Sequence, residues 1–227
     1  MVPFVKKTFR YRFLLKVLFS INYHKSYKIR KLMEALILAG GENKRMPMIK
    51  GLLKIGGKVI VESNVRILQD IFDRVVVSTN SPDLFFYLGS PLVGDVMCER
   101  GPMTGILSAF IGAGAAEFFV TACDMPFINV ILIKHIVRQW QNRWDAAIPM
   151  FHGKPQPLFG IYSRKVVGRM EKSIRAGERG LRDFLKKIDV LYIEENVVKR
   201  IDREGRTFVN INTLDDFRRE GGTICSV

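Results

Sequence analysis

The chain has 227 residues, of which 48% are hydrophobic, and it carries a formal net charge of +14. A chain of this length can bury roughly 70% or more of its unfolded surface, so it needs no disulfide framework. Its three cysteines (Cys98, Cys123 and Cys225) are odd in number and scattered, which indicates a reducing compartment. No apolar run is long enough for a transmembrane helix, and we expect a cytoplasmic protein.

The beginning of the chain holds most of the charge. Residues 1–32 contain nine lysines and arginines and no acid, mixed with apolar residues, and they leave +5 on the remainder. Such a segment is typical of a membrane-surface helix or of a nucleic-acid-binding arm. The hypothesis that we favour is that Met33 is the true start and that residues 1–32 are a translation artefact. We therefore expect a basic extension at 1–32, disordered or artefactual, and an enzyme domain at 33–227.

The first predicted strand leads into a loop that suits phosphate. The apolar run 35–38 ends in Gly40 and Gly41, and three cations follow: Lys44, Arg45 and Lys50. Glycines let backbone N–H groups approach phosphate oxygens, and a cation about 4 Å from a phosphate contributes roughly 4 kcal/mol at an effective dielectric near 20. The pattern favours a nucleotide triphosphate site. A plain turn followed by solvated lysines stays open.

Two other phosphate-binding patterns are missing from this loop. It contains neither the Gly-Lys-Ser/Thr of a P-loop nor the Gly-x-Gly-x-x-Gly of a dinucleotide site. Kinase, GTPase and NAD-binding functions are therefore disfavoured.

Strand and helix patterns alternate along the next part of the chain. Apolar periodicity predicts strands at 35–38, 74–78, 118–121 and 146–150, and helices at 60–72, 103–111 and 130–140. The C-terminal third is less regular, with strands at 158–162 and 190–194 and helices at 166–174, 181–188 and 214–219. The alternation predicts a single-domain α/β fold: a doubly wound, mostly parallel, Rossmann-like sheet with helices on both faces and ligands beyond the strand carboxyl ends.

Two further turns fall where ligands are expected. The apolar run 118–123 is followed by Asp124, a carboxylate positioned to hold a metal ion. For a lone aspartate in a turn, capping the next helix is the commoner role. The segment 101–105 (Gly-Pro-Met-Thr-Gly) opens a helix and lets the backbone come close to a ligand, or it is an ordinary helix N-terminus.

Six groups of residues, in this order, carry a resemblance that none of them carries alone: Leu38-Ala39-Gly40-Gly41, Lys44-Arg45-Met46, Lys50, Gly101-Pro102-Met103-Thr104-Gly105, Cys123-Asp124-Met125-Pro126-Phe127 and Val209-Asn210-Ile211-Asn212-Thr213. Together they resemble the molybdenum cofactor guanylyltransferase family, from about Met33 to about Arg219. The resemblance implies Mg²⁺-dependent transfer of GMP from GTP to the terminal phosphate of molybdopterin-bound molybdenum, with release of pyrophosphate. It also implies transient contact with molybdenum-inserting or cofactor-accepting proteins. No specific nucleic-acid partner is expected, because most of the positive charge lies in residues 1–32 and not on the enzyme-like part.

The same resemblance assigns roles by position. It implies nucleotide contacts at Leu38, Ala39, Gly40, Gly41, Lys50, Ser78, Asn80, Asp95 and Asp124, with Asp124 also holding Mg²⁺. It implies that Lys50, Asp124 and Arg45 are the catalytic residues. The pterin end of the substrate is expected near residues 176–180 and 210–213, with Arg179 and Asn212 as candidates.

Several positions depart from the family pattern. Pro47 and Ile49 stand where the family usually has Gly and Asp, and neither change removes a phosphate-contacting group. Ser78 stands where an asparagine is common, and Asn80, two residues further on, is the other candidate for that contact.

The chemistry can also be argued from the residues. An attacking phosphate is already an anion, so catalysis must neutralise charge and align the reacting groups, and it needs no strong base. The loop cations and a metal on Asp124 suit that task. Two alternatives remain: a related nucleotidyltransferase that uses CTP on molybdopterin or acts on a sugar phosphate, and a non-enzymatic basic protein that binds nucleic acid or membrane surfaces.

Overall fold

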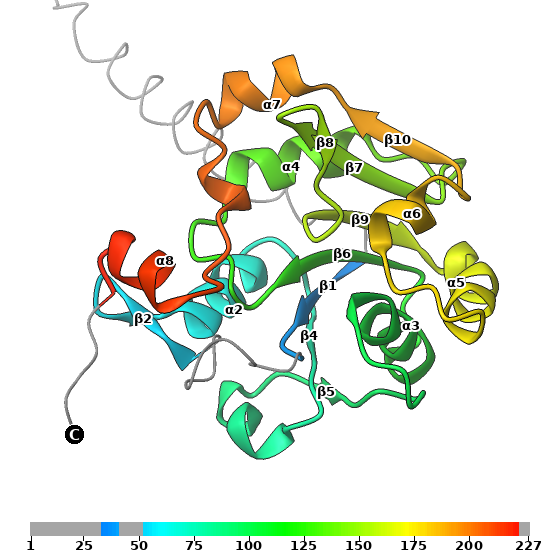
Figure 1. Ribbon diagram of the computed structural model, residues 1–227, viewed down its shortest axis with the longest axis horizontal. Coiled ribbons are helices and arrows are strands. Elements are labelled where there is room, and N and C mark those ends of the chain that lie inside the picture. The colour runs from blue at the N-terminus through cyan, green and yellow to red at the C-terminus, as the bar shows by residue number, and fades with distance from the viewer. Residues whose placement is uncertain (1–32, 41–51, 223–227) are drawn as a thin grey trace, which may run out of the picture.

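The computed structural model describes residues 33–40 and 52–222, which form one sheet covered by helices (Figure 1). Four strands run parallel in the order β6 (Glu117–Ala122), β1 (Met33–Leu38), β4 (Val75–Ser78) and β5 (Leu92–Val93). Leu36 at the centre of β1 is level with Val76 and Val120 on its two neighbours. The carboxyl ends of these strands therefore meet at one edge.

The other half of the sheet is mixed. β9 (Gly160–Ser163) is antiparallel to both β6 and β7 (Ala146–Phe151), and β10 (Val190–Ile193) is parallel to β7. The short β8 (Lys154–Pro155) folds back on β7. β9 runs in the direction opposite to β6. The loop before β9 therefore lies at the edge where β1 and β6 end, and the loop after β9 lies at the other edge.

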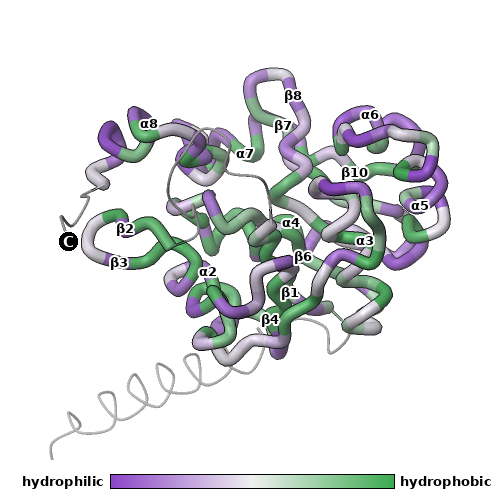
Figure 2. The backbone as a smooth tube through the Cα atoms, turned by 60° about the horizontal axis from the view of Figure 1, so that its bottom comes forward, coloured by the Kyte–Doolittle hydropathy of each residue, from purple (hydrophilic) through white to green (hydrophobic). Residues whose placement is uncertain are grey.

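Each face of the sheet has its own hydrophobic cluster, and the alternation of side chains along a strand explains why. Ala35 and Ile37 belong to one cluster, whereas Leu36 and Leu38 belong to the other. The first cluster packs against α2 (Ile60–Gln69), α4 (Val130–Gln139) and α7 (Glu195–Ile201). The second packs against α3 (Pro102–Ala113), α5 (Val167–Arg175) and α6 (Leu181–Leu185). Figure 2 shows the hydrophobic colour concentrated on the central strands.

Small elements complete the described chain. β2 (Lys54–Ile55) and β3 (Lys58–Val59) form a separate hairpin, and α8 (Leu214–Arg219) lies beside it, joined by a bridge from Ile55 to Gly222. The 3₁₀ turns are η2 (Pro82–Leu84), η3 (Phe86–Leu88), η4 (Arg164–Val166) and η5 (Arg206–Phe208). No helix among residues 33–40 and 52–222 is long and apolar enough to cross a bilayer.

The predicted fold class is confirmed, as are the longer elements. α2 ends at Gln69 and α6 at Leu185, each three residues before the predicted end. The strand predicted at 158–162 begins at Gly160, because residues 156–159 form a turn closed by the bond from the Phe159 N–H to the Gln156 carbonyl. The sequence analysis did not predict α7 or the two-residue strands β2, β3, β5 and β8, whose hydrophobic patterns are too short to show periodicity.

Gly160 is the position at which the antiparallel insertion of β9 is most sensitive to substitution. A Cβ there would lie 2.4 Å from the Ala147 carbonyl oxygen on β7, and a backbone atom cannot move aside easily. We expect Gly160→Ala to lower the free energy of unfolding by about 1–3 kcal/mol, as overpacked cores do. Urea unfolding followed by circular dichroism measures the change. The matched control is Gly168→Ala on α5, where no atom lies within 4 Å of the added Cβ. Equal losses in the two variants would contradict this prediction.

Candidate functional site

The carboxyl ends of three neighbouring strands are tied together by backbone hydrogen bonds. The Ala39 N–H donates to the Ser78 carbonyl at 2.8 Å, and the Cys123 N–H donates to the Leu38 carbonyl at 3.0 Å. Leu38 is buried, Ala39 is half-buried and Gly40 is exposed, so the chain leaves the sheet at Gly40. The sheet edge therefore places Gly40 beside the turn that carries Asp124.

Half of the predicted phosphate loop lies outside the described residues. Gly41, Lys44, Arg45 and Lys50 all fall in the segment 41–51, so the predictions made for them stay predictions. What the structure does describe is where this segment leaves and rejoins the fold. It leaves at Gly40 and rejoins at Leu52, one residue before Leu53, which is buried in a small core with Ile60, Ile211 and Phe217.

The turn that carries Asp124 is held from three sides. The Ile211 N–H donates to the backbone carbonyl of Asp124 at 2.9 Å, so the C-terminal segment is pinned to this turn. The buried Asn64 side chain on α2 donates to the Met125 carbonyl at 3.1 Å. The Arg206 guanidinium stacks 3.9 Å from the Phe127 ring centre and pairs with Glu220 at 2.8 Å. The half-buried carboxylate of Asp124 is thus carried by a fixed backbone.

The helix that follows Gly101 packs closely on the same strand ends. A Cβ at Gly105 would lie 2.9 Å from Ser78 Oγ and 3.0 Å from Leu38 Cδ2, so only glycine fits there without a shift. Ser78 is 3% exposed and lies under α3. Gly101 has φ +147° and Pro102 begins α3, which matches the predicted helix N-terminus.

Asn80 and Asp95, both predicted nucleotide contacts, are brought together by the structure. Asn80 Nδ2 donates to Asp95 Oδ2 at 2.7 Å, and the Asp95 N–H donates to Asn80 Oδ1 at 2.8 Å. Asn80 follows β4 and Asp95 follows β5, so the pair lies at the same sheet edge as Gly40 and Asp124. The edge thus carries four of the predicted positions in one row.

A cavity of about 440 Å³ opens next to the Asp124 turn, and we call it the α6 pocket. Its wall runs from Met125 and Asn210 past Pro102 to Pro157, Gly180 and Arg182. Asn210 Oδ1 is buried and has no hydrogen-bond partner among the described residues. Arg182 is exposed at the start of α6. The lining of the α6 pocket therefore combines apolar residues with an exposed cation, Arg182, and an exposed carboxylate, Asp183.

One wall of the α6 pocket is the segment 156–159 between β8 and β9. Tyr162, fully buried on β9, donates its hydroxyl to the Pro157 carbonyl at 2.8 Å. Burial raises the pKa of Tyr162 far above its ordinary value, with a smaller contribution from Tyr192, so this hydroxyl stays a donor at any physiological pH. The Gln156 side-chain amide donates to the Phe151 and Lys154 carbonyls, at 3.3 and 3.2 Å.

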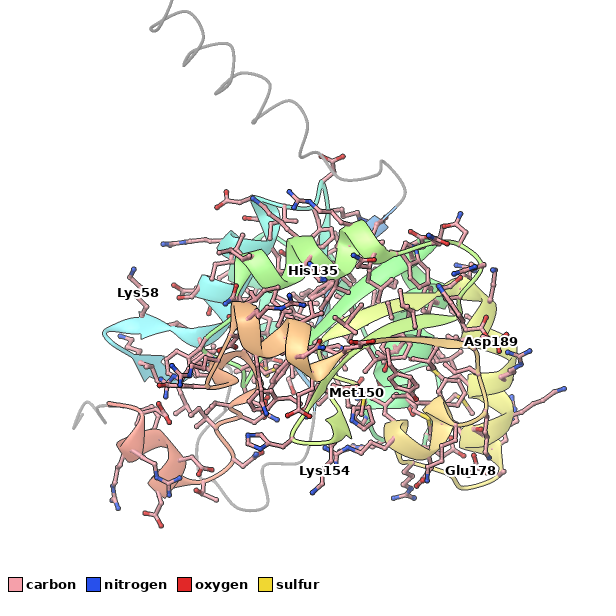
Figure 3. The ribbon with its side chains drawn as sticks, turned by 90° about the horizontal axis from the view of Figure 1, so that it is seen from above. Lys58, His135, Met150, Lys154, Glu178 and Asp189 are labelled. Carbon is pink, nitrogen blue, oxygen red and sulfur yellow. The ribbon has the colours of Figure 1, made fainter. Side chains whose placement is uncertain are left out.

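The β7–β8 hairpin that leads to this wall is held by α7. Its turn contains His152, at φ +51°, and Gly153, whose N–H donates to Glu195 Oε2 at 2.8 Å. Glu195 also pairs with Lys199 at 2.7 Å. Figure 3 shows Lys154 at the tip of the hairpin, pointing away from the sheet. The hairpin is therefore fixed at its turn as well as along its strands.

The predicted metal ligand can be judged from the chemistry of its surroundings. In the described part of the chain no three His, Cys, Asp or Glu side chains gather as a metal cage. Mg²⁺ in nucleotide sites is usually bound through one or two carboxylates together with substrate phosphates and water. A single carboxylate at the strand edge, beside the turn at Gly40, fits that mode of binding.

Comparison with known proteins agrees with this geometry. Residues 35–191 match the family model described as the MobA-like NTP transferase domain. The chain belongs to this family. The match begins on β1 and ends on β10, so the MobA-like domain includes every strand of the main sheet and both turns at Gly40 and Asp124.

Relatives of this MobA-like chain cover most of its length. A probable molybdenum cofactor guanylyltransferase of Pelotomaculum thermopropionicum is 33% identical over 181 residues, which span 80% of this chain and 88% of the relative. The molybdenum cofactor guanylyltransferase of Syntrophotalea carbinolica is 31% identical, over 82% of this chain and 91% of the relative. The crystal structure of molybdopterin-guanine dinucleotide biosynthesis protein A from Archaeoglobus fulgidus has 26% identity and a TM-score of 0.73, over 83% and 97% of the two chains.

The α6 pocket takes part of its lining from the two segments for which the sequence predicted contact with the substrate. Residues 176–180 and 210–213 were expected near the substrate's pterin end, and Gly180 and Asn210 do line the α6 pocket. Arg179 and Asn212, the two candidates, do not line it, whereas Arg182 does. The predicted start of α6 at Leu181 is confirmed, but the sequence could not show that the first turn of this helix lines the α6 pocket.

Protonation of the Glu195 carboxylate at acidic pH should destabilise the β7–β8 hairpin. The Lys199 ammonium, helped by the N–H groups of Gly153 and His152, lowers the pKa of Glu195 from 4.5 to about 2. A carboxylate with a depressed pKa stabilises the fold fully above its unfolded pKa and loses that contribution as pH falls toward the folded value. We expect the stability difference between the native chain and Glu195→Gln to be constant from pH 7 to 5 and to shrink below about pH 4.5.

Urea midpoints measured across that pH range test the Glu195 prediction. Glu204→Gln, which changes an exposed acid on the loop after α7, corrects for general charge effects. A difference that stays constant down to pH 3 would show that Glu195 does not act through its charge.

Proposed function

We propose that this chain is a molybdenum cofactor guanylyltransferase. It transfers GMP from GTP to the terminal phosphate of the molybdopterin that carries molybdenum, and it releases pyrophosphate. The observation that carries the proposal is the α6 pocket, which opens from the turn of Asp124 at the strand edge where the family loop begins. A nucleotide held at the edge and an acceptor held in the α6 pocket meet at Asp124. The relatives that bear this enzyme name support the same activity.

The reaction needs two anions to be brought together. An oxygen of the acceptor phosphate attacks the α-phosphorus of GTP, a new P–O bond forms, and the bond to the β-phosphate breaks with pyrophosphate leaving. We assign Lys50 and Arg45 to the neutralisation of the triphosphate, and the backbone of Leu38, Ala39, Gly40 and Gly41 to its alignment. Mg²⁺, when held by Asp124 and the phosphates, would supply further positive charge at the same place.

The described residues set the orientation of the loop at Gly40 relative to the turn of Asp124. The backbone bonds from Ala39 to Ser78 and from Cys123 to Leu38 fix the distance between the loop at Gly40 and the turn of Asp124. Fixed groups lose no free energy in reorganising when charge moves during the reaction, which is why preorganised sites accelerate phosphoryl transfer. In the α6 pocket, the exposed guanidinium of Arg182 can bind the phosphate of the acceptor.

The first experiment is direct. The purified full chain, Mg²⁺ and molybdopterin-bound molybdenum are incubated with GTP, CTP or ATP, and pyrophosphate release and the nucleotide content of the product are measured. GTP-specific release with a guanine-bearing product is the expected result. A preference for CTP would keep the chemistry and overturn the base assignment. No turnover with any of the three nucleotides would overturn the proposed function.

Removing the Asp124 carboxylate should lower turnover sharply. The hydrogen bond from Ile211 uses the backbone carbonyl, so Asp124→Ala leaves it in place. We expect turnover to fall by a factor on the order of 10² or more, because a preorganised charge-stabilising group is lost. Initial rates at saturating Mg²⁺ and GTP measure the effect, and Asp83→Ala, which changes an exposed acid on η2, is the control. Activity retained by Asp124→Ala would remove Asp124 from the metal role.

Replacing Arg182 should weaken binding of the molybdopterin substrate and leave binding of GTP unchanged. We expect Arg182→Ala to raise the KM for the molybdopterin substrate by about tenfold or more, the equivalent of one charged hydrogen bond, and to leave the KM for GTP unchanged. Arg182→Lys should recover part of the loss. The control is Arg175→Ala, an exposed cation on α5 that pairs with Glu171 and lies outside the α6 pocket. Equal changes in both KM values would show that Arg182 does not distinguish the two substrates.

A further inference from the structure

The excess positive charge of the enzyme-like part is concentrated on α5 and α6. Residues 164–187 hold nine lysines and arginines against three acids, a net charge of +6. Residues 33–227 together carry +5, so everything outside this segment sums to −1. The structure describes the whole segment, and Figure 1 shows α5 and α6 side by side. We call the outer side of residues 164–187 the α5–α6 surface.

The two helices turn their charges outward because their apolar side chains are committed to the core. Met170 and Ile174 from α5 and Phe184 from α6 are all buried in the second hydrophobic cluster. Arg169 and Lys172, three positions apart on α5, are both exposed. Residues with this spacing are neighbours on one side of a helix, so the cations form a stripe that faces solvent.

Only part of this charge is cancelled by neighbouring acids. Lys172, Arg179 and Arg182 are exposed, and none of them pairs with an acid among the described residues. Cations in ion pairs contribute much less to the field at a distance, and four have such partners: Arg169 with Asp145, Arg175 with Glu171, Lys186 with Asp183 and Lys187 with Glu178.

The α5–α6 surface borders the mouth of the α6 pocket. Gly180 and Arg182 line the pocket, whereas Lys172 does not. The Glu178 N–H donates to the Ser173 carbonyl at 3.0 Å, so the chain turns back on the end of α5 before it enters α6. Gly180 is two residues beyond Glu178, which places Lys172 on the order of 15 Å from the mouth of the pocket. This distance is too long for contact with a bound ligand. It is shorter than the Debye length of about 30 Å at 0.01 M salt.

The composition of the α5–α6 surface favours a small anion over a macromolecule. None of the large exposed hydrophobic side chains of the described chain lies in residues 164–187, and the one aromatic residue of this segment, Phe184, is buried. Protein interfaces rely on apolar or aromatic anchors, membrane-surface helices present an apolar face to lipid, and single-stranded nucleic acids stack on exposed aromatic rings. A small, mobile anion requires only the charge.

We propose that the α5–α6 surface captures the anionic acceptor from solution and guides it into the α6 pocket, and that Lys172 acts at long range without contacting the bound acceptor. A surface of one sign beside a cleft raises the local concentration of the oppositely charged substrate and accelerates its association. The inference rests on the proposed function and deepens it, because it gives the acceptor an approach route separate from the strand edge assigned to GTP.

A charge series at position 172 tests the proposal in the full chain. At about 0.01 M salt, we expect Lys172→Glu to lower kcat/KM for the molybdopterin substrate by about threefold or more, because two units of charge change within the Debye length. Lys172→Ala should give a smaller loss and Lys172→Arg none. The kcat and the KM for GTP should stay unchanged in all three variants. At about 1 M salt, where the Debye length is about 3 Å, the differences should disappear.

The matched control is Lys58→Glu, which makes the same change of charge at an exposed lysine on β3. Figure 3 shows Lys58 and Glu178 at opposite ends of the molecule, so this variant alters the net charge but not the α5–α6 surface. Equal losses in Lys58→Glu and Lys172→Glu would overturn the proposal, because they would show an effect of net charge alone. A loss in Lys172→Glu that persists at high salt would overturn it as well, since a screened interaction cannot survive there.

Stopped-flow binding of the molybdopterin substrate without GTP, followed by the fluorescence of its pterin, separates this proposal from the transfer reaction. A slower association rate in Lys172→Glu than in Lys58→Glu, with an unchanged dissociation rate, supports capture even if no product forms. Equal association rates in the two variants overturn the capture role and leave the proposed function standing. An absence of acceptor binding by the native chain overturns the proposed function, and the capture role with it.

Discussion

The central constraint in this molecule is the burial of β1 between β4 and β6, parallel to both. The strand has no exposed face, because its odd and even residues fill two different hydrophobic clusters, so its register cannot slip without exposing both sets. That register fixes the bonds from Ala39 to Ser78 and from Cys123 to Leu38. Those two bonds determine how the loop at Gly40 lies relative to Ser78 and to the turn of Asp124.

The sequence predicts this half of the molecule well, for a physical reason. Strands buried on both faces appear in the sequence as continuous apolar runs. The residues that follow them, such as Gly40 and Asp124, are recognised by the abrupt change from apolar to small or charged side chains. The Asn80–Asp95 bond is invisible at that level, because it joins residues fifteen positions apart through a loop of 3₁₀ turns that has no periodicity. Sequence reasoning could name both residues by resemblance, but it could not show that they contact each other.

The C-terminal half was harder to predict because its contacts are tertiary. The reversed direction of β9 leaves no mark in its composition, and Gly160 is identified as necessary only once Ala147 is seen against it. The same holds for the α6 pocket, whose wall is assembled from Met125, Pro157, Arg182 and other residues distant in sequence. Arg206 illustrates the difficulty, because it joins Phe127 to Glu220 through contacts that no periodicity of the sequence marks.

The bond from Ile211 to Asp124 has a consequence for the order in which the molecule forms. Strands β1, β4, β6, β7 and β9 are all complete by Ser163, so a nascent chain can assemble most of its sheet before the segment with Arg206 and Ile211 emerges from the ribosome. The support that Ile211 and Arg206 give to the Asp124 turn arrives only at the end of synthesis. A growing chain would thus assemble most of its sheet before the turn that carries Asp124 gains its last backbone support.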